Sequence, residues 1–225
     1  MKHIISNLVV GALVVVCIVI GVVSFQDRKY NLVSILIALL ACIPFYVVYE
    51  NKRGNIRRMV VLSILISLSV IGRLLVFVPG FKPVTAIVIL TGLYMGAEAG
   101  FLCGSLSAVL SNMFFGQGPW TPFQMLAWGS AGFIAGIPFI RKVLQNKIAL
   151  LVYGGGSGVL YSFVMDIWTV LSFDGIFSIS RYMVAITAAI PVTFEYVVSN
   201  IIFLFVLRKP IGEKLQRIKV KHGIF

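Results

Sequence analysis

The sequence predicts an all-α integral membrane protein, in which a six-helix core follows two accessory transmembrane helices. Of its 225 residues, 60% are hydrophobic and only 12% are charged, and the mean hydropathy is +1.03. This composition is too apolar for a soluble domain. Apolar runs of about 20 residues, the length that crosses a bilayer as a helix, follow one another along the chain. Helices are also the open structures that satisfy their own backbone in lipid.

Eight apolar runs are expected to be helical. The first two lie in residues 1–58, which end in a polar, basic connection and form the accessory part. The next six lie in residues 59–207 and form the core, and residues 208–225 form a basic cytoplasmic tail. The eight runs are Ile4–Phe25, Asn31–Val48, Met59–Val78, Pro83–Met95, Ala97–Phe115, Trp120–Ile140, Ile148–Leu171 and Tyr182–Leu207.

The run Pro83–Met95 is short, and only Gly96 separates it from the next run, so it is either its own crossing or half of a longer helix. The distribution of positive charge favours its own crossing, because cytoplasmic connections carry an excess of Lys and Arg. With eight crossings, the only outer basic residues are Arg28, Lys29, Lys82 and Arg181. We therefore expect both termini to be cytoplasmic.

The formal net charge of +12 does not indicate nucleic acid, since no soluble basic module is present. A membrane enzyme is disfavoured as well, because no Cys and His spacing resembles a metal site or a catalytic pair. The glycine-rich segment 154–158 lacks the Gly-Lys-Ser/Thr ending of a phosphate-binding loop, and we interpret it as close helix packing. We expect no catalytic residues, no metal and no cofactor.

Small residues recur every fourth position in two core helices. Gly96, Gly100 and Gly104 predict close packing of the fifth run against its neighbours. Ser63 and Ser67 form a similar pair on the third run. This pair is either packed inside the core or exposed as a docking surface for another membrane protein.

Four charged residues fall within the predicted spans, where a charge is costly unless it has a partner or faces water. Arg73 and Asp166 are expected at similar depth near the outer side, which would allow them to pair. Glu98 is near an inner helix end, and Glu195 is near mid-membrane. Structural pairing and a role in a substrate site both remain open for these residues.

The segment 114–122 predicts a tight outer loop that enters the sixth run, because it contains two glycines, two prolines and a tryptophan. An aromatic belt at the membrane interface would explain the tryptophans. A ligand pocket explains the neighbouring amides and hydroxyl better. We therefore expect a pocket lined by the loop and helix start, with Arg73 and Asp166 lining or supporting it; the loop residues are Gln117, Trp120, Thr121, Gln124 and Trp128.

Three stretches resemble the substrate-binding S components of energy-coupling factor (ECF) vitamin transporters of prokaryotes. They are Val70-Ile71-Gly72-Arg73, Gly96-Ala97-Glu98-Ala99-Gly100-Phe101 and the segment from Phe115 to Gly129. The resemblance covers about Met59 to Leu207. Within the family, the loop looks most like the cobalamin group.

The resemblance implies a substrate-specific subunit of an ATP-driven importer in the plasma membrane of a prokaryote. It implies an S-component-like core that captures a vitamin, with cobalamin the specific expectation, on the extracellular side. A transmembrane coupling subunit would dock on small residues of the first core helix, where Ser63 and Ser67 stand in place of the alanines typical of the family. Two cytoplasmic ATPases would supply the energy.

Two other functions remain open. A self-sufficient secondary transporter would be driven by protons through Glu195 or Asp166. A structural or assembly protein would bind no small molecule. The chain is expected to have no enzymatic activity of its own.

Overall fold

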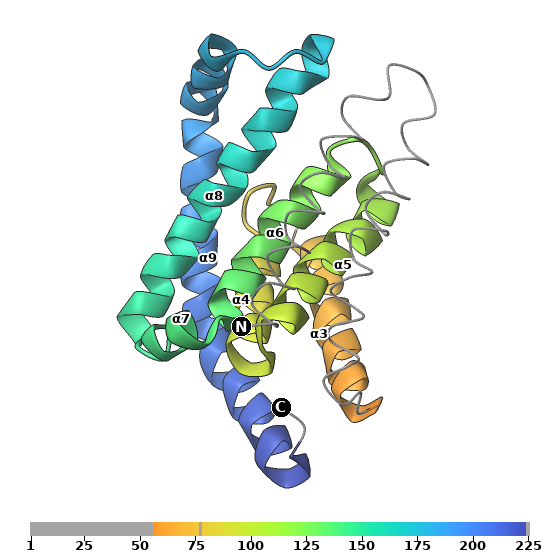
Figure 1. Ribbon diagram of the computed structural model, residues 1–225, viewed down its shortest axis with the longest axis vertical. Coiled ribbons are helices and arrows are strands. Elements are labelled where there is room, and N and C mark those ends of the chain that lie inside the picture. The colour runs from red at the N-terminus through yellow and green to blue at the C-terminus, as the bar shows by residue number, and fades with distance from the viewer. Residues whose placement is uncertain (1–55, 77, 224–225) are drawn as a thin grey trace, which may run out of the picture.

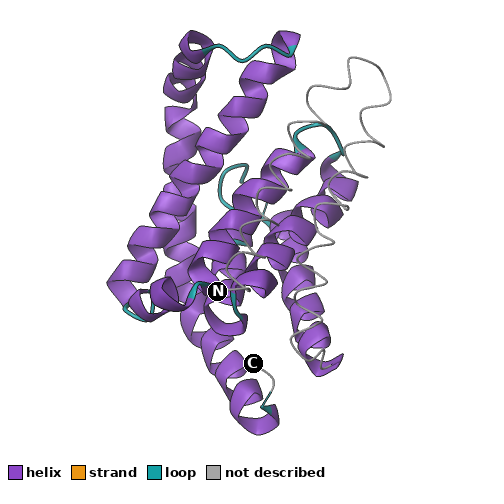
Figure 2. Cartoon of the chain, in the orientation of Figure 1, coloured by secondary structure: helices purple, strands orange, loops and turns teal. Residues whose placement is uncertain are grey.

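The computed structural model describes residues 56–76 and 78–223. The two predicted accessory helices, Ile4–Phe25 and Asn31–Val48, lie outside the described residues. Within these residues every regular element is a helix, as the sequence predicts (Figure 2).

The structure has a helix in each of the six predicted core runs. A short additional helix, α7, follows α6, because Ile137 has an extended backbone that ends α6. The bounds are α3 Ile56–Leu75, α4 Val84–Met95, α5 Ala97–Phe115, α6 Thr121–Gly136, α7 Pro138–Val143, α8 Lys147–Asp174 and α9 Ile179–His222.

Four of the described helices, α3, α5, α8 and α9, are long and apolar enough to cross a membrane. The helix α4 has 12 residues, which span only about 18 Å at 1.5 Å per residue. It is a separate helix and not half of α5, because Gly96, with a φ of 103°, interrupts the helical backbone between them. Residues other than glycine rarely adopt this conformation.

Helix α4 lies at the centre of the bundle and contacts α3, α5, α6, α8 and α9 (Figure 1). Eleven of its 12 residues are buried, which explains why apolar residues occur on every face of this helix. Its last carbonyl groups accept hydrogen bonds from two arginines, Arg58 to Met95 O at 2.9 Å and Arg141 to Tyr94 O at 3.2 Å. Cations are favourable at a helix C-terminus.

Glycines bring the backbones of α4, α5 and α6 into direct contact, which confirms the packing interpretation. A Cβ at Gly100 or at Gly132 would overlap the backbone of the other residue. A Cβ at Gly104 would overlap the backbone of Trp128 and Gly129. Close backbone approach of this kind supplies packing where lipid offers no hydrophobic driving force.

Helices α8 and α9 form an antiparallel hairpin that extends beyond the neighbouring helices (Figure 1). Gly154 and Gly158 lie inside α8 and pack against α9, so the glycine-rich segment has a packing role. Helix α9 continues through the residues predicted as a tail and ends at His222.

Candidate functional site

A cavity of about 390 Å³ lies between α3, α4, α5, α6, α8 and α9. Its walls come from the end of α3, the start of α4, the end of α5 and the first turns of α6, together with the middle of α8 and α9. On the predicted topology this is the outer side. The lining residues are Arg73, Pro79, Gly80, Lys82, Val84, Thr85, Phe115, Gln124, Trp128, Gly158, Tyr161, Tyr196 and Asn200.

Arg73, on the last turn of α3, is held by α5. Its Nη1 donates hydrogen bonds to Ser111 Oγ and, at 2.8 Å, to Asn112 Oδ1. The guanidinium also lies 4.8 Å from the ring centre of Phe115 and 5.0 Å from that of Trp128. These cation–π contacts and neutral hydrogen bonds fix the side chain without neutralising its charge.

A chain of buried amides and a hydroxyl continues from Arg73 across the bundle. Asn112 Nδ2 donates to Gln124 Oε1 at 2.7 Å, and Gln124 Nε2 donates to Tyr161 OH at 3.0 Å. Thr121 accepts a second bond from Asn112 and donates to Gln117 Oε1. Helices α3, α5, α6 and α8 are therefore joined by polar groups behind one wall of the cavity.

Aromatic rings form another wall. Trp128 stacks on Tyr161 with 5.1 Å between the ring centres, and Tyr161 meets Tyr196 edge-on at 5.0 Å. Such pairs bury large apolar faces and hold each ring in one orientation. The three rings therefore support one another at the cavity that they line.

The connection from α3 to α4 covers the cavity beside α9. The Lys82 backbone N–H donates to Ser199 Oγ at 2.9 Å, and Lys82 Nζ donates to the Val76 carbonyl. Lys82 Nζ also lies 5.8 Å from the Phe115 ring centre, so Phe115 contacts two cations. Burial and the charge of Arg73 lower the pKa of Lys82.

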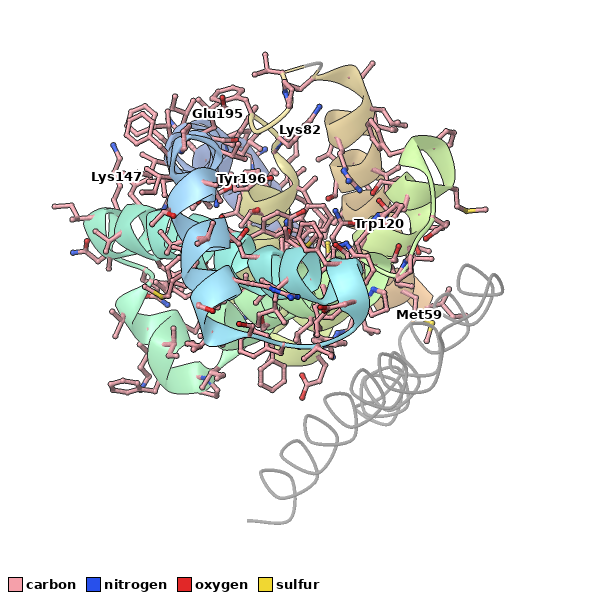
Figure 3. All side chains as sticks on the ribbon, turned by 90° about the horizontal axis from the view of Figure 1, so that it is seen from above. Met59, Lys82, Trp120, Lys147, Glu195 and Tyr196 are labelled. Carbon is pink, nitrogen blue, oxygen red and sulfur yellow. The ribbon has the colours of Figure 1, made fainter. Side chains whose placement is uncertain are left out.

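Glu195 lies on the α9 side of this connection. A Cβ at Gly80 would overlap the Glu195 side chain, so Gly80 permits the contact. Figure 3 shows Lys82 and Glu195 along one edge of this view, with Lys82 between Glu195 and Trp120.

A family model described as the substrate-specific component of ECF transporters matches residues 57–211. The chain belongs to this family. ECF substrate-specific components are substrate-binding, multi-pass membrane subunits that associate with transmembrane and ATPase subunits. The searches of curated proteins and of solved structures each found no match.

Three residues predicted for the site of this substrate-specific component line the cavity, namely Arg73, Gln124 and Trp128. Thr121 and Gln117 do not line it but belong to the hydrogen-bonded network behind Gln124. Trp120 packs against Trp168, with ring centres 6.5 Å apart.

Asp166 is not among the residues that line the cavity. It is buried on α8, and its Oδ2 has no hydrogen-bond partner among the described residues. Of the two roles left open for the charged residues, pairing of Asp166 with Arg73 is not seen, since the guanidinium hydrogen-bonds to Ser111 and Asn112 instead. Depth along a span did not reveal which face of α8 carries Asp166.

Several lining residues of the substrate-specific component were not predicted. Tyr161, Tyr196 and Asn200 come from α8 and α9, and Lys82 comes from the connection before α4. Asn112, which organises the network, was missed as well. The sequence contained a signal for Asn112, because a polar side chain inside an apolar membrane helix needs a hydrogen-bond partner.

Ser63 and Ser67 are exposed along α3, where they line a shallow groove of about 510 Å³. The neighbouring exposed residues are apolar and include Val60, Ile64 and Leu68. The alternative that this pair is packed in the described core is therefore wrong. Docking of a partner subunit on it remains a prediction.

In the described part of the chain, no three His, Cys, Asp or Glu side chains gather as metal ligands. Cys103 is buried and lies 3.4 Å from the Thr91 hydroxyl oxygen. Cys103 and Thr91 are both buried and contribute to the packing of the helices.

Proposed function

We propose that the cavity captures a small organic anion of vitamin type on the extracellular side, for ATP-driven import by the partner subunits. The observation that carries the proposal is the charge of the lining. Arg73 and Lys82 both line the cavity, whereas its described lining residues include no Asp or Glu.

The start of α4 adds to this positive field. Val84 and Thr85 line the cavity and stand in the first turn of α4, where backbone N–H groups have no acceptor within the helix. No side chain caps this turn. A helix N-terminus favours negative charge, so a carboxylate or phosphate group between Arg73, Lys82 and α4 would meet three positive sources.

The rest of the lining suits the body of such a molecule. Trp128, Tyr161 and Tyr196 line the cavity with aromatic side chains. The amide nitrogens of Gln124 and Asn200, which donate to the Tyr161 hydroxyl and to a backbone carbonyl, each have a second N–H that a ligand could accept. Small-molecule sites combine mostly apolar walls with a few fixed polar groups in this way. The aromatic wall would cover a planar ring while the amides fix its orientation.

Cavity size bears on the choice between two substrate classes. The resemblance of the loop favours cobalamin, but a corrin ring with its nucleotide is much larger than a cavity of about 390 Å³. That volume lies near the lower end of the range for small-molecule sites. We therefore favour a smaller anionic vitamin and keep cobalamin as the alternative to be tested.

A self-sufficient proton-coupled transporter is the competing function. Its candidate proton carriers, Asp166 and Glu195, do not line the cavity. Family membership instead pairs the chain with ATPase subunits. Uptake that continues after inactivation of the partner ATPases would favour the proton-coupled alternative.

The test begins with mass spectrometry of the ligand that co-purifies with the full chain. Affinity is then measured by calorimetry for that ligand, for cobalamin and for vitamins that carry a carboxylate, a phosphate or no charge. Arg73→Gln and Lys82→Gln should each weaken binding of an anionic vitamin by about tenfold or more, equivalent to about 1.4 kcal/mol.

The matched control is Arg181→Gln, because Arg181 is an exposed cation that pairs with Asp174 at the tip of the α8–α9 hairpin. It should leave affinity unchanged. Tight binding of a neutral or cationic vitamin that is insensitive to both cavity substitutions would overturn the anion assignment. Tight binding of cobalamin would show that the substrate is a corrinoid and not a smaller anionic vitamin.

A further inference from the structure

A second hollow lies at the opposite end of the bundle, beside the C-terminal part of α9. This basic groove has a volume of about 1190 Å³ and runs between Tyr94, the start of α8 and α9 beyond Phe205. Five cations line it against one carboxylate, that of Glu213. The cations are Lys147, Arg208, Lys209, Arg217 and Lys221.

Two of these cations are fixed to the wall of the groove. Lys147 Nζ lies 4.1 Å from the ring centre of Phe205, and Arg208 Nη2 donates to the Gln145 carbonyl. Neither contact neutralises a positive charge. The cations are therefore held in place without a carboxylate partner.

The other three cations lie on α9, with Arg217 and Lys221 one turn apart. Like charges at this spacing repel each other. The basic residues of the groove form no salt bridge with a described carboxylate; the described ion pair is Arg181–Asp174, at the far end of α9. A bound anion would relieve this repulsion.

The same helix segment is anchored on the core of the bundle. Ile211 and Leu215 are buried, and a Cβ at Gly212 would overlap Tyr94. The cations are thus presented on a helix that packs against the core, and not on a free tail.

The groove also has an apolar part. Phe205, Val206 and Val220 line it and are exposed. The apolar stretch of α9 ends at Leu207, directly before Arg208, so the cations begin where the membrane-spanning part stops. A phospholipid has a negative headgroup joined to apolar chains at this depth of a membrane, whereas a soluble anion would leave the apolar part uncovered.

We propose that the basic groove binds an anionic phospholipid of the inner leaflet, with its headgroup phosphate between the α9 cations and Lys147 and its chains along Phe205 and Val206. The site is separate from the substrate cavity. It would fix the depth of α9 relative to the membrane while leaving the outer cavity free for ligand.

The experiment uses the full chain in detergent and measures lipid binding by native mass spectrometry. Dioleoylphosphatidylglycerol is titrated in parallel with zwitterionic dioleoylphosphatidylcholine. The double substitution Arg217→Gln with Lys221→Gln removes two groove cations. Each basic residue near an anionic lipid contributes about a fivefold factor in affinity, so the loss of two should lower phosphatidylglycerol affinity by about 25-fold.

The matched control is Lys214→Gln with Lys219→Gln, which removes the same charge from the same helix at positions that do not line the groove. It should retain phosphatidylglycerol binding. An equal loss of phosphatidylglycerol affinity in both double variants would show that only general electrostatic attraction is involved, and would overturn the proposal. Equal binding of the two lipids would also overturn it.

Two further measurements complete the test. Circular dichroism without lipid checks that each double variant is folded, and the exposed single variant Lys221→Gln, with an expected loss of about fivefold, replaces the pair if it is not. Inorganic phosphate at millimolar concentration should not displace the lipid. Displacement would show a site for soluble anions instead.

Discussion

Asn112 Nδ2 donates to Gln124 Oε1 at 2.7 Å, and this hydrogen bond joins α5 to α6 behind the cavity. Asn112 is 1% exposed and is bonded through the other side of its amide to Arg73. One buried side chain therefore sets the positions of two lining residues on different helices.

Replacing Asn112 by Leu should lower both stability and ligand affinity. The change removes the hydrogen bonds that Asn112 makes to Gln124 Oε1 and to Arg73 Nη1, and a buried polar group that loses its hydrogen bond costs about 1–3 kcal/mol. Thermal unfolding in detergent measures the stability, and calorimetry measures the affinity. Thr169→Ala is the control, because the Thr169 hydroxyl is exposed and bonds only within its own helix. An Asn112→Leu variant with unchanged melting temperature would refute the role of the network.

Gln124→Ala should weaken ligand binding by about tenfold, which corresponds to about 1.4 kcal/mol, because Gln124 lines the cavity. Trp120→Ala should have a smaller effect on affinity and a larger one on melting temperature, since Trp120 packs against Trp168 outside the lining. The two variants are compared by calorimetry and thermal unfolding. The opposite ranking of affinities would place the pocket at the loop.

Replacing both Ser63 and Ser67 by Leu should abolish uptake into cells while the isolated chain still binds ligand. The reason is that leucine side chains would fill the exposed groove of α3 and keep a partner helix at a distance. The double alanine variant is the control, since alanine is as small as serine and should preserve uptake. Loss of ligand binding in the leucine variant would show that the effect reaches the cavity and is not confined to docking.

Gly100→Ala should strongly reduce the yield and melting temperature of the protein. The new methyl group would overlap the Gly132 backbone, and backbone atoms move less readily than a flexible side chain. Gly156→Ala is the matched control, because a Cβ there meets nothing within 4 Å. Alanine is favoured over glycine inside a helix by about 1 kcal/mol, so this control should be neutral or stabilising. Similar melting temperatures for both variants would contradict the packing described for α5 and α6.

The sequence was sufficient to predict the helical class and a helix in each of the six core runs, because composition and run length are direct consequences of a lipid environment. It also indicated Arg73, Gln124 and Trp128 as neighbours. These three residues have polar or amphipathic side chains and lie toward the predicted outer ends of their helices. Two of them, Gln124 and Trp128, also follow the same loop in the sequence.

The other lining residues depend on how the helices rotate about their axes. Tyr161 and Tyr196 could equally belong to an interface belt until α8 and α9 are seen to pack beside α6. Asp166 was predicted to line or support the pocket because of its depth along α8. It does not line the cavity, because it lies on another face of that helix. Which face a residue occupies depends on the packing of glycines such as Gly154 and Gly158, and the pattern of one helix does not specify its neighbour.

The shortness of α4 bears on how much work the partner subunits have to do. Its C-terminal carbonyls meet Arg58 and Arg141 at the basic end of the bundle, and its N-terminal turn borders the cavity. On the predicted topology, with α4 along the membrane normal, a solute at that turn would lie about 18 Å, the length of α4, from the cytoplasmic end of this helix, out of a hydrocarbon thickness of about 30 Å. If the cavity is the substrate site proposed above, the remaining part of that thickness, about 12 Å by difference, would be crossed by diffusion into a preformed site, without any input of ATP. The movement driven by the partner ATPases would then have to carry the solute only along the length of α4.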